Sequence, residues 1–340
     1  METQRINISK IMLLVTLFLI ANVVVAILFG GRFYNVRNMT SMGFQIGEFA
    51  FLCMAMALAM LTGGIDLSVV ANMNLAGVLA GFVLTNDALV ASIGPSGTVL
   101  LAVVVALVSG LTAGIFNGFL IAKIGIHSVL ATIGTMMFFA GIGMVLTGGR
   151  GVVGFPTEFA FIGNGSVAGF PFPFLLMIVA FLIVGFFLNR SNWGKSLYLF
   201  GSNSVASRFS GIRNQKTILI TYAIGGLLCA FSALILISRS NSARIGFGES
   251  YLLQAVVVSV MGTMDPKGGS GRFSGIFISV LLLQLLSSAF TRLGVTPFAR
   301  GLVYGSILLL IIIAYELLSG REVLMPVLRK AQISDGTGGS

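Results

Sequence analysis

About ten long apolar runs constrain this chain more than any other feature of its sequence. They cover residues 11–30, 44–62, 67–84, 98–121, 128–147, 172–188, 217–237, 251–264, 273–291 and 299–318. A membrane-spanning helix needs about 20 mostly apolar residues. The whole chain is 56% hydrophobic and 9% charged, whereas soluble domains have about 25% charged residues. The sequence therefore predicts an all-α polytopic membrane protein with about ten transmembrane helices, some of them short or broken.

The distribution of Lys and Arg predicts the orientation in the membrane. With the N-terminus in the cytoplasm, 13 of these 20 residues fall on the cytoplasmic side and 7 on the other. Because basic residues concentrate in cytoplasmic loops, we expect both termini to be cytoplasmic. We expect one transmembrane domain over residues 1–330, with a cytoplasmic loop at 189–216, an outer loop at 148–173 and a flexible cytoplasmic tail at 331–340.

Several kinds of site are excluded by the polar residues. The net charge of +10 comes from basic residues scattered among apolar segments, which indicates membrane orientation and not nucleic acid binding. Cys53 and Cys229 lie in apolar runs and His127 is the single histidine, so no metal cluster is expected. The stretch WGKS at 193–196 has Asn189 where a phosphate-binding loop needs glycine, so we expect no bound ATP and no other cofactor on this chain.

The acidic residues do not favour an ion-coupled transporter. By the predicted topology, Glu48 alone lies within a span and away from a loop, near the outer end. No pair of carboxylates is placed for a proton relay near the midplane. No Ser/His/Asp or Cys/His constellation is readable either, so the sequence does not predict an enzyme.

Glycine and asparagine residues in the apolar runs indicate where helices pack closely or where a polar path could run. Glycines recur every four residues in two of the apolar runs, at Gly77 and Gly81 and at Gly110, Gly114 and Gly118. This spacing predicts close helix packing. Asn72, Asn74 and Asn117 stand in the same runs, and they either tie helices together or line a polar path.

Four motifs in order resemble the membrane permease subunits of bacterial ABC importers for ribose, xylose, galactose and related solutes, a group that includes autoinducer-2 import permeases. They are LTGGIDLSV at 61–69, NGFLIAKIGIHSVLATIGTM at 117–136, GSNSVASRFSGI at 201–212 and VVVSVMGTMDPKGGSGRFSG at 256–275. The resemblance covers nearly the whole chain. It departs from the family at His127 and Ser128, where a proline-aromatic pair is common, and at the MDPK of the last motif.

The resemblance implies an energy source on other chains. In such importers two permease subunits, two copies or a copy and a sister permease, form the pathway in the cytoplasmic (inner) membrane. Two cytoplasmic ABC ATPase domains bind ATP and Mg²⁺, and an extracytoplasmic binding protein delivers the solute. A small sugar or sugar-like solute is the expected cargo, with a nucleoside or autoinducer-2 as the alternative. An ion-coupled secondary transporter and a membrane scaffold without transport are the competing classes.

The third motif is the expected contact with the ATPases. Gly201 and Asn203 suit a turn and a helix N-cap, and a short helix through Ala206 and Phe209 would end near Gly211. Basic residues there would pair with acids on the partner. The predicted coupling residues are Gly201, Asn203, Ala206, Arg208, Phe209, Ser210, Gly211 and Ile212.

The first motif is interpreted as a structural turn between two helices. Gly63 and Gly64 allow the chain to turn, and Asp66, with Ser68 nearby, is expected to cap the next helix. The solute needs polar groups along its path, and the candidates are Asn72, Asn74, Asn117, Gln254 and Ser259.

Overall fold

The computed structural model describes residues 2–296, 299–310 and 313. The chain divides into two compact units, one ending at Val295 and the other beginning at Thr296. Over the described residues the secondary structure is almost entirely helical, with four strands of two residues each. The predicted tail at 331–340 lies outside the described residues.

Each predicted apolar run coincides with a helix, in whole or in its described part. Nine of these helices belong to the first unit: α1 (Glu2–Phe29), α2 (Val36–Leu61), α3 (Val69–Leu84), α4 (Asp87–Phe119), α5 (Ser128–Thr147), α7 (Phe172–Arg190), α10 (Asn214–Ser240), α11 (Glu249–Met261) and α12 (Phe273–Arg292). The helix Ala299–Leu310 belongs to the second. Among the described residues, seven helices are long and apolar enough to cross a membrane, and α3, α11 and Ala299–Leu310 are shorter. The all-α membrane fold with some short helices is therefore confirmed.

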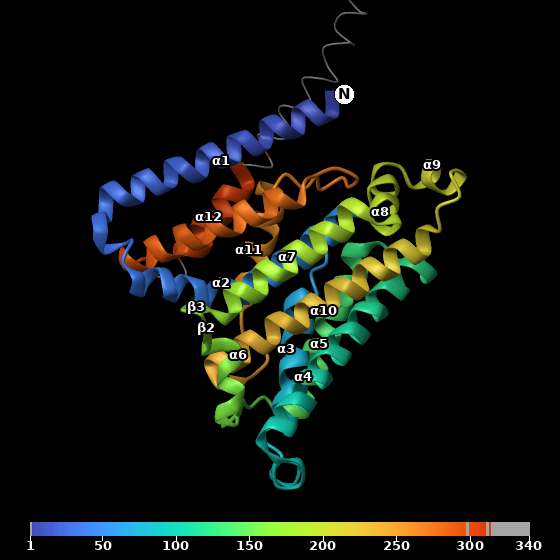
Figure 1. Ribbon diagram of the computed structural model, residues 1–340. Helices are drawn as coiled ribbons and strands as arrows, with labels where there is room; N and C mark the ends of the chain where they lie inside the picture. Colours follow the sequence, from blue (N-terminus) through green and yellow to red (C-terminus); the bar gives the residue numbers. More distant parts are fainter. Residues whose placement is uncertain (1, 297–298, 311–312, 314–340) are drawn as a thin grey trace, which may run out of the picture. The chain divides into compact units, whose positions relative to one another are not determined.

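Short elements connect the long helices. The loop at 148–173 contains β1 (Val152–Val153), the 3₁₀ turn η3 (Thr157–Phe159), α6 (Ala160–Asn164), β2 (Ser166–Val167) and β3 (Phe170–Pro171). β1 pairs antiparallel with β4 (Ser242–Ala243), and β2 pairs with β3. The loop at 189–216 contains α8 (Asn192–Ser202) and α9 (Ser204–Phe209). The two loops lie at opposite ends of α10 (Figure 1).

The fourth helix begins earlier than its apolar run predicts. The run starts near residue 98, but α4 starts at Asp87, where the Asn86 side chain accepts the Leu89 N–H as an N-cap. Gly94 has a φ of 74° next to Pro95, so the helix is broken at this point. The first segment, residues 87–93, is too short to form a span by itself and is followed by Gly94 and Pro95, which is why the apolar pattern did not reveal it.

The glycine pattern on α4 brings α4 and α10 into backbone contact. A Cβ added at Gly110 or Gly114 would overlap the carbonyl oxygen of Gly226 or Tyr222 on α10. At Gly118 an added Cβ would come within 3.0 Å of the Leu219 Cα. The predicted packing role of this stripe is confirmed, since small residues let membrane helices approach closely.

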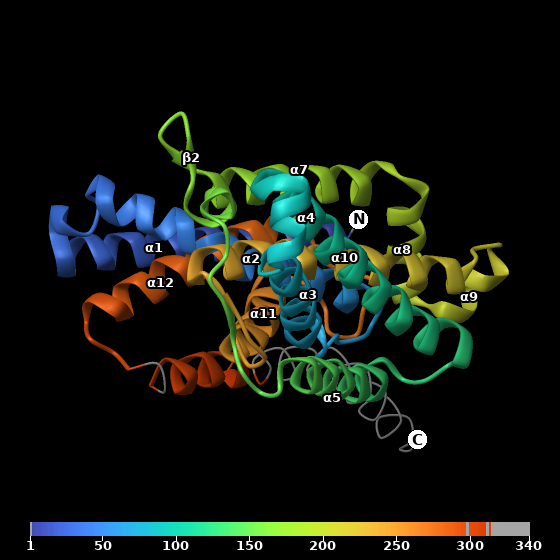
Figure 2. The ribbon, with the colours of Figure 1, turned by 90° about the horizontal axis from the view of Figure 1, so that it is seen from below.

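The second helix occupies the centre of the first unit. Every residue from Ile46 to Leu61 is buried, and α2 contacts α7, α10, α11 and α12. Viewed from below, α7 and α5 lie on opposite sides of α2 and α10 (Figure 2). The ends of these helices bring the four motifs together.

Candidate functional site

The four sequence motifs meet at one end of the first unit. The Gly269 N–H donates to the Leu61 carbonyl at 3.1 Å, which joins the fourth motif to the first. The Ser202 hydroxyl donates to the Gly269 carbonyl at 3.2 Å and adds the third motif. The Asn117 amide donates to the Ser68 hydroxyl at 2.7 Å and adds the second. Segments that are far apart in the sequence therefore form one polar, glycine-rich junction.

The turn from Thr62 to Ser68 is the centre of this junction. Gly63 has a φ of 76°, a conformation that favours glycine. Gly64 has no such requirement, but a Cβ there would lie 2.5 Å from the Ser128 hydroxyl of α5. The Thr132 hydroxyl of α5 accepts the Leu67 N–H at 3.1 Å. Gly63 is thus needed for the turn, and Gly64 for the contact with α5.

Asp66 holds the start of this turn into α3. Its Oδ1 accepts the Ser68 N–H at 2.9 Å and the Ser68 hydroxyl at 2.6 Å. The N-cap of α3 is Ser68 and not Asp66, and its side chain makes no capping bond. The expectation that Asp66 caps the helix is therefore corrected: its carboxylate caps the turn just before it, because the chain turns once more at Leu67 and Ser68. Burial raises the pKa of the Asp66 carboxyl.

The candidate pathway residues are buried or half-buried. Asn72 donates to the Gly110 carbonyl of α4 at 3.3 Å, and Asn117 donates to Ser68. Both Oδ1 atoms are buried without a partner. The two amides therefore fit a role in hydrogen-bonding helices together better than a role in lining an open path. Each still has an Oδ1 atom that could accept a hydrogen bond.

The other three candidates lie on α3 and α11. Asn74 and Ser259 are buried, and Gln254 is half-buried. The Ser259 hydroxyl lies 3.5 Å from the Cys53 carbonyl of α2. Among the described residues, no side-chain hydrogen bond links these three to Asn72 or Asn117, so the five candidates do not form one hydrogen-bonded site.

The third motif forms the short helix that its residues predict. The Asn203 side chain accepts the N–H groups of Val205 and Ala206 at 3.0 and 2.9 Å and is the N-cap of α9. The helix ends at Phe209, with Ser210 as C-cap and a φ of 79° at Gly211. Asn214 closes the loop by donating to the Ser204 carbonyl at 2.8 Å. A preorganised helix thus projects from the end of α10.

Gly201 has another role than the predicted turn. It lies inside α8, where a Cβ would overlap the Leu61 carbonyl and the Gly269 backbone. The close approach of three chain segments requires glycine there, and sequence alone did not show those neighbours.

The outer surface of α9 is apolar and is bordered by basic residues. Phe209 is 89% exposed and Val205 is 63% exposed. A cavity of about 730 Å³ beside α9 is lined by four basic side chains, those of Lys123, Arg208, Arg213 and Lys216, together with Ile212. An exposed aromatic anchor beside cationic groups is typical of a protein contact surface.

A second polar site joins three helices at the other end. Glu48 on α2 forms an ion pair with Arg239 on α10 and accepts the Tyr251 hydroxyl of α11. Glu48 also fixes α10 through its carbonyl, which accepts the Ser232 hydroxyl. The sequence singled out Glu48 but not its partners, because Arg239 and Tyr251 are 191 and 203 residues away.

The residues described here do not form a metal site. In the described part of the chain, no group of three His, Cys, Asp or Glu side chains is placed to hold a metal ion. The chemistry available at the junction is hydrogen bonding and close backbone packing.

Comparison with known proteins matches nearly the whole chain. A family model described as "Branched-chain amino acid transport system / permease component" matches residues 38–312. Ribose import permease protein RbsC of Bacillus subtilis is 32% identical over 92% of this chain and 95% of that protein. The protein of the same name in Escherichia coli K12 is 32% identical over 83% of this chain and 86% of its own. Autoinducer 2 import system permease protein LsrD of Yersinia enterocolitica is 28% identical over 89% of this chain and 92% of its own.

Proposed function

The chain belongs to the family of branched-chain amino acid transport system permease components, and from this membership we propose that it forms the translocation pathway of an ATP-driven importer for a small sugar. It is a permease subunit with a transport role, and it is a multi-pass protein of the bacterial inner membrane. The observation that carries the substrate class is the 32% identity to a ribose import permease over 92% of this chain.

Autoinducer-2 remains the second candidate substrate. The similarity to the autoinducer-2 import permease spans 89% of this chain, at 28% identity. A nucleoside is a third possibility within the same mechanism. All of these solutes carry several hydroxyl or amide groups, so a path with a few hydrogen-bonding side chains suits each of them.

The energy for import comes from separate ATPase subunits in this proposal. The α9 helix is their docking element, with Phe209 as the apolar anchor and Arg208 and Arg213 as partners for acidic side chains. Its neighbour α8 contacts the first and fourth motifs through Gly201. Closure of the ATPases on ATP would therefore displace α8 and α9 against the motif junction and change which side of the path is open.

Two further partners complete the complex. A second permease subunit, identical or a sister chain, forms the other half of the path. An extracytoplasmic binding protein delivers the solute at the end that carries the 148–173 loop. This assignment rests on the predicted orientation, in which the 189–216 loop is cytoplasmic.

Reconstitution tests the function. The chain is placed in proteoliposomes with the ATPase and the binding protein of a ribose or autoinducer-2 import system, and uptake of labelled ribose, autoinducer-2 and leucine is measured. We expect ATP-dependent uptake of ribose or autoinducer-2, insensitive to an ionophore. Uptake that survives without ATP but collapses with the ion gradient would support a secondary transporter instead.

One substitution tests the coupling helix separately. Phe209→Asp places a charge on the exposed anchor without a buried neighbour to disturb, and Ala206→Glu does so one turn earlier. We expect either variant to lose ATP-dependent uptake while it still inserts and binds the delivered solute. Phe209→Leu keeps an apolar anchor and serves as the matched control. Normal uptake in Phe209→Asp would place the coupling contact elsewhere.

A further inference from the structure

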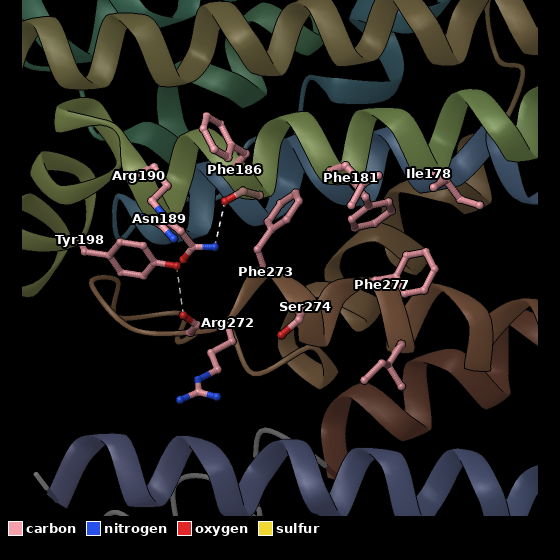
Figure 3. A pocket seen from close by; sticks show the side chains of 14 residues that line it. Ile178, Phe181, Phe186, Asn189, Arg190, Tyr198, Arg272, Phe273, Ser274 and Phe277 are labelled. Carbon is pink, nitrogen blue, oxygen red and sulfur yellow. Dashed lines mark hydrogen bonds between the residues drawn. The ribbon is translucent and has the colours of Figure 1, made fainter.

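A long groove runs between α7 and the start of α12. It has a volume of about 920 Å³ and is closed at one end by α8 and by the loop at Gly271 and Arg272 (Figure 3). The groove shares α8 and the Gly271 loop with the motif junction, but none of the residues that line it belongs to the Asp66 turn or to α9. Neither the transport path nor the ATPase contact proposed above uses it.

Most of the groove is apolar. Phe181 packs against Phe273 and Phe277, with ring centroids 5.3 and 5.2 Å apart. On the α7 wall, Leu182 and Phe186 are 67% and 63% exposed. Gly185 leaves space between these walls, because a Cβ added there would meet only the Phe273 ring, at 3.6 Å. Since α7 is long and apolar enough to cross a membrane, this surface suits a hydrocarbon chain.

The closed end of the groove is polar and basic. Arg190 ends α7, Arg272 precedes α12, and Tyr198 stands between them and donates its hydroxyl to the Gly271 carbonyl at 3.1 Å. Figure 3 shows the two arginine side chains on different sides of Tyr198. Among the described residues, neither guanidinium forms an ion pair with a carboxylate, so both are available to an anion.

We propose that this groove binds an anionic phospholipid, with an acyl chain along α7 and α12 and the phosphate at the basic closed end that Arg190 and Arg272 provide. Basic pockets between transmembrane helices bind anionic headgroups in this way. An anionic lipid needs both an apolar surface for its acyl chain and a basic site for its phosphate, and two other cavities each provide only one of these. The cavity beside α9 is basic but has few apolar residues, and the one lined by Met39, Ile46 and Phe174 is apolar but has no charged residue.

A second copy of the chain fits the groove less well. A symmetric contact between two copies uses the same surface on both. It would bring the arginines of the two chains together at the same depth, with no acid in the groove to compensate them. A lipid phosphate instead supplies the missing negative charge.

Native mass spectrometry of the full chain in detergent tests the proposal. Phosphatidylglycerol and phosphatidylcholine are titrated in parallel. We expect one phosphatidylglycerol to be retained in preference to phosphatidylcholine. Arg190→Gln with Arg272→Gln should weaken this binding about 30-fold, since each basic residue near a membrane surface contributes about a factor of five. The matched control, Lys123→Gln with Lys195→Gln, removes the same charge at the same end outside the groove and should leave it unchanged.

Shape is tested independently of charge. Gly185→Leu fills the apolar part and should reduce retention of the lipid, while the arginines stay in place. Excess glycerol phosphate should not displace the lipid, because it has no acyl chain. A thermal unfolding scan of each variant identifies loss of fold, and for a variant that unfolds, Gly185→Ala and the single arginine variants are used instead.

Three results would overturn the proposal. The first is equal retention of the two lipids, the second is equal retention by the double arginine variant and its control, and the third is displacement by glycerol phosphate.

Leu182→Cys offers a further check in the bilayer, because Cys53 and Cys229 are buried. Efficient disulfide cross-linking of two chains through Cys at position 182 would show a second copy in the groove and would also overturn it.

Discussion

Glu48 and Asp66 are two carboxylates with nearly the same exposure and opposite surroundings. Glu48 is 6% exposed and Asp66 is 7% exposed. Glu48 is paired with Arg239 and receives the Tyr251 hydroxyl, so its contacts reach two other helices. Both Asp66 bonds go to Ser68, two residues away. Within the described residues, Asp66 forms no ion pair.

The difference separates two ways to keep an acid inside a membrane protein. A buried charge is costly unless it is paired and hydrogen-bonded. At Glu48 the compensation comes from a cation on another helix, so the helices must be assembled before the charge is satisfied. At Asp66 the compensation is local, and Ser68 passes it on to Asn117 of α4. The contacts of Glu48 therefore depend on how the helices assemble, whereas those of Asp66 depend mainly on the conformation of one turn.

Removal of the cation at the Glu48 site has the largest expected effect. Arg239→Leu leaves Glu48 buried without its partner, and we expect the free energy of unfolding to fall by about 3 kcal/mol. Thermal and denaturant unfolding in detergent measure the change. Arg244→Leu, an exposed arginine after the same helix, is the control. Glu48→Leu combined with Arg239→Leu should recover most of the loss, and no recovery would contradict the pairing.

Removal of the Asp66 carboxyl has the next largest effect. Asp66→Ala loses both bonds to Ser68, and we expect a loss of about 2 kcal/mol in unfolding free energy. Asp66→Asn keeps an acceptor oxygen and should lose less. The ratio of ribose to autoinducer-2 uptake should stay the same in both. A clean change in that ratio would show that Asp66 contacts the solute.

The pH dependence of stability, compared between the wild-type chain and Asp66→Asn, reports on the Asp66 carboxyl. Because burial raises the pKa of Asp66 in the folded state, folding favours the protonated carboxyl. Its contribution is fully present below the unfolded pKa, about 4, and is lost as pH rises through the folded pKa. Relative to Asp66→Asn, the wild-type chain should lose stability as pH rises through this range. A constant difference between the two would contradict the raised pKa.

An exposed acid provides the smallest effect. Glu249 lies in the first turn of α11 and is exposed. Glu249→Gln removes only its interaction with the positive end of the helix dipole, and we expect a loss of at most about 0.5 kcal/mol. The same unfolding assay measures it. A loss as large as that of Arg239→Leu would contradict the comparison, because an exposed acid would then matter as much for stability as a buried, paired one.

Much of the fold was predictable because its signals are local. Apolar length placed the helices, and the four-residue glycine spacing predicted the contact surface of α4. Asn203 predicted the start of α9 because an N-cap bonds to amides two and three residues later. The start of α4 was missed because its first two turns are short and are followed by Gly94 and Pro95, which separate them from the long apolar run.

The candidate site was predictable only in part. Family resemblance singled out the four motifs, but nothing in their spacing showed that they touch. Asp66 was expected to cap α3 but holds the preceding turn through Ser68. Gly201 was expected in a turn but lies in α8, in close contact with Leu61 and Gly269. Whether the amides line a path or the 201–212 segment binds an ATPase stays a prediction.

By itself, the sequence determined a polytopic helical membrane protein that belongs to a family of import permeases, because hydropathy, caps and motifs act over a few residues or one helix. Only the tertiary structure decided which groups meet. It paired Glu48 with Arg239, brought Gly201 against Leu61, and placed Arg190 and Arg272 at one end of an apolar groove. These contacts join residues tens to hundreds of positions apart, and their partners depend on how the helices pack and not on any local pattern.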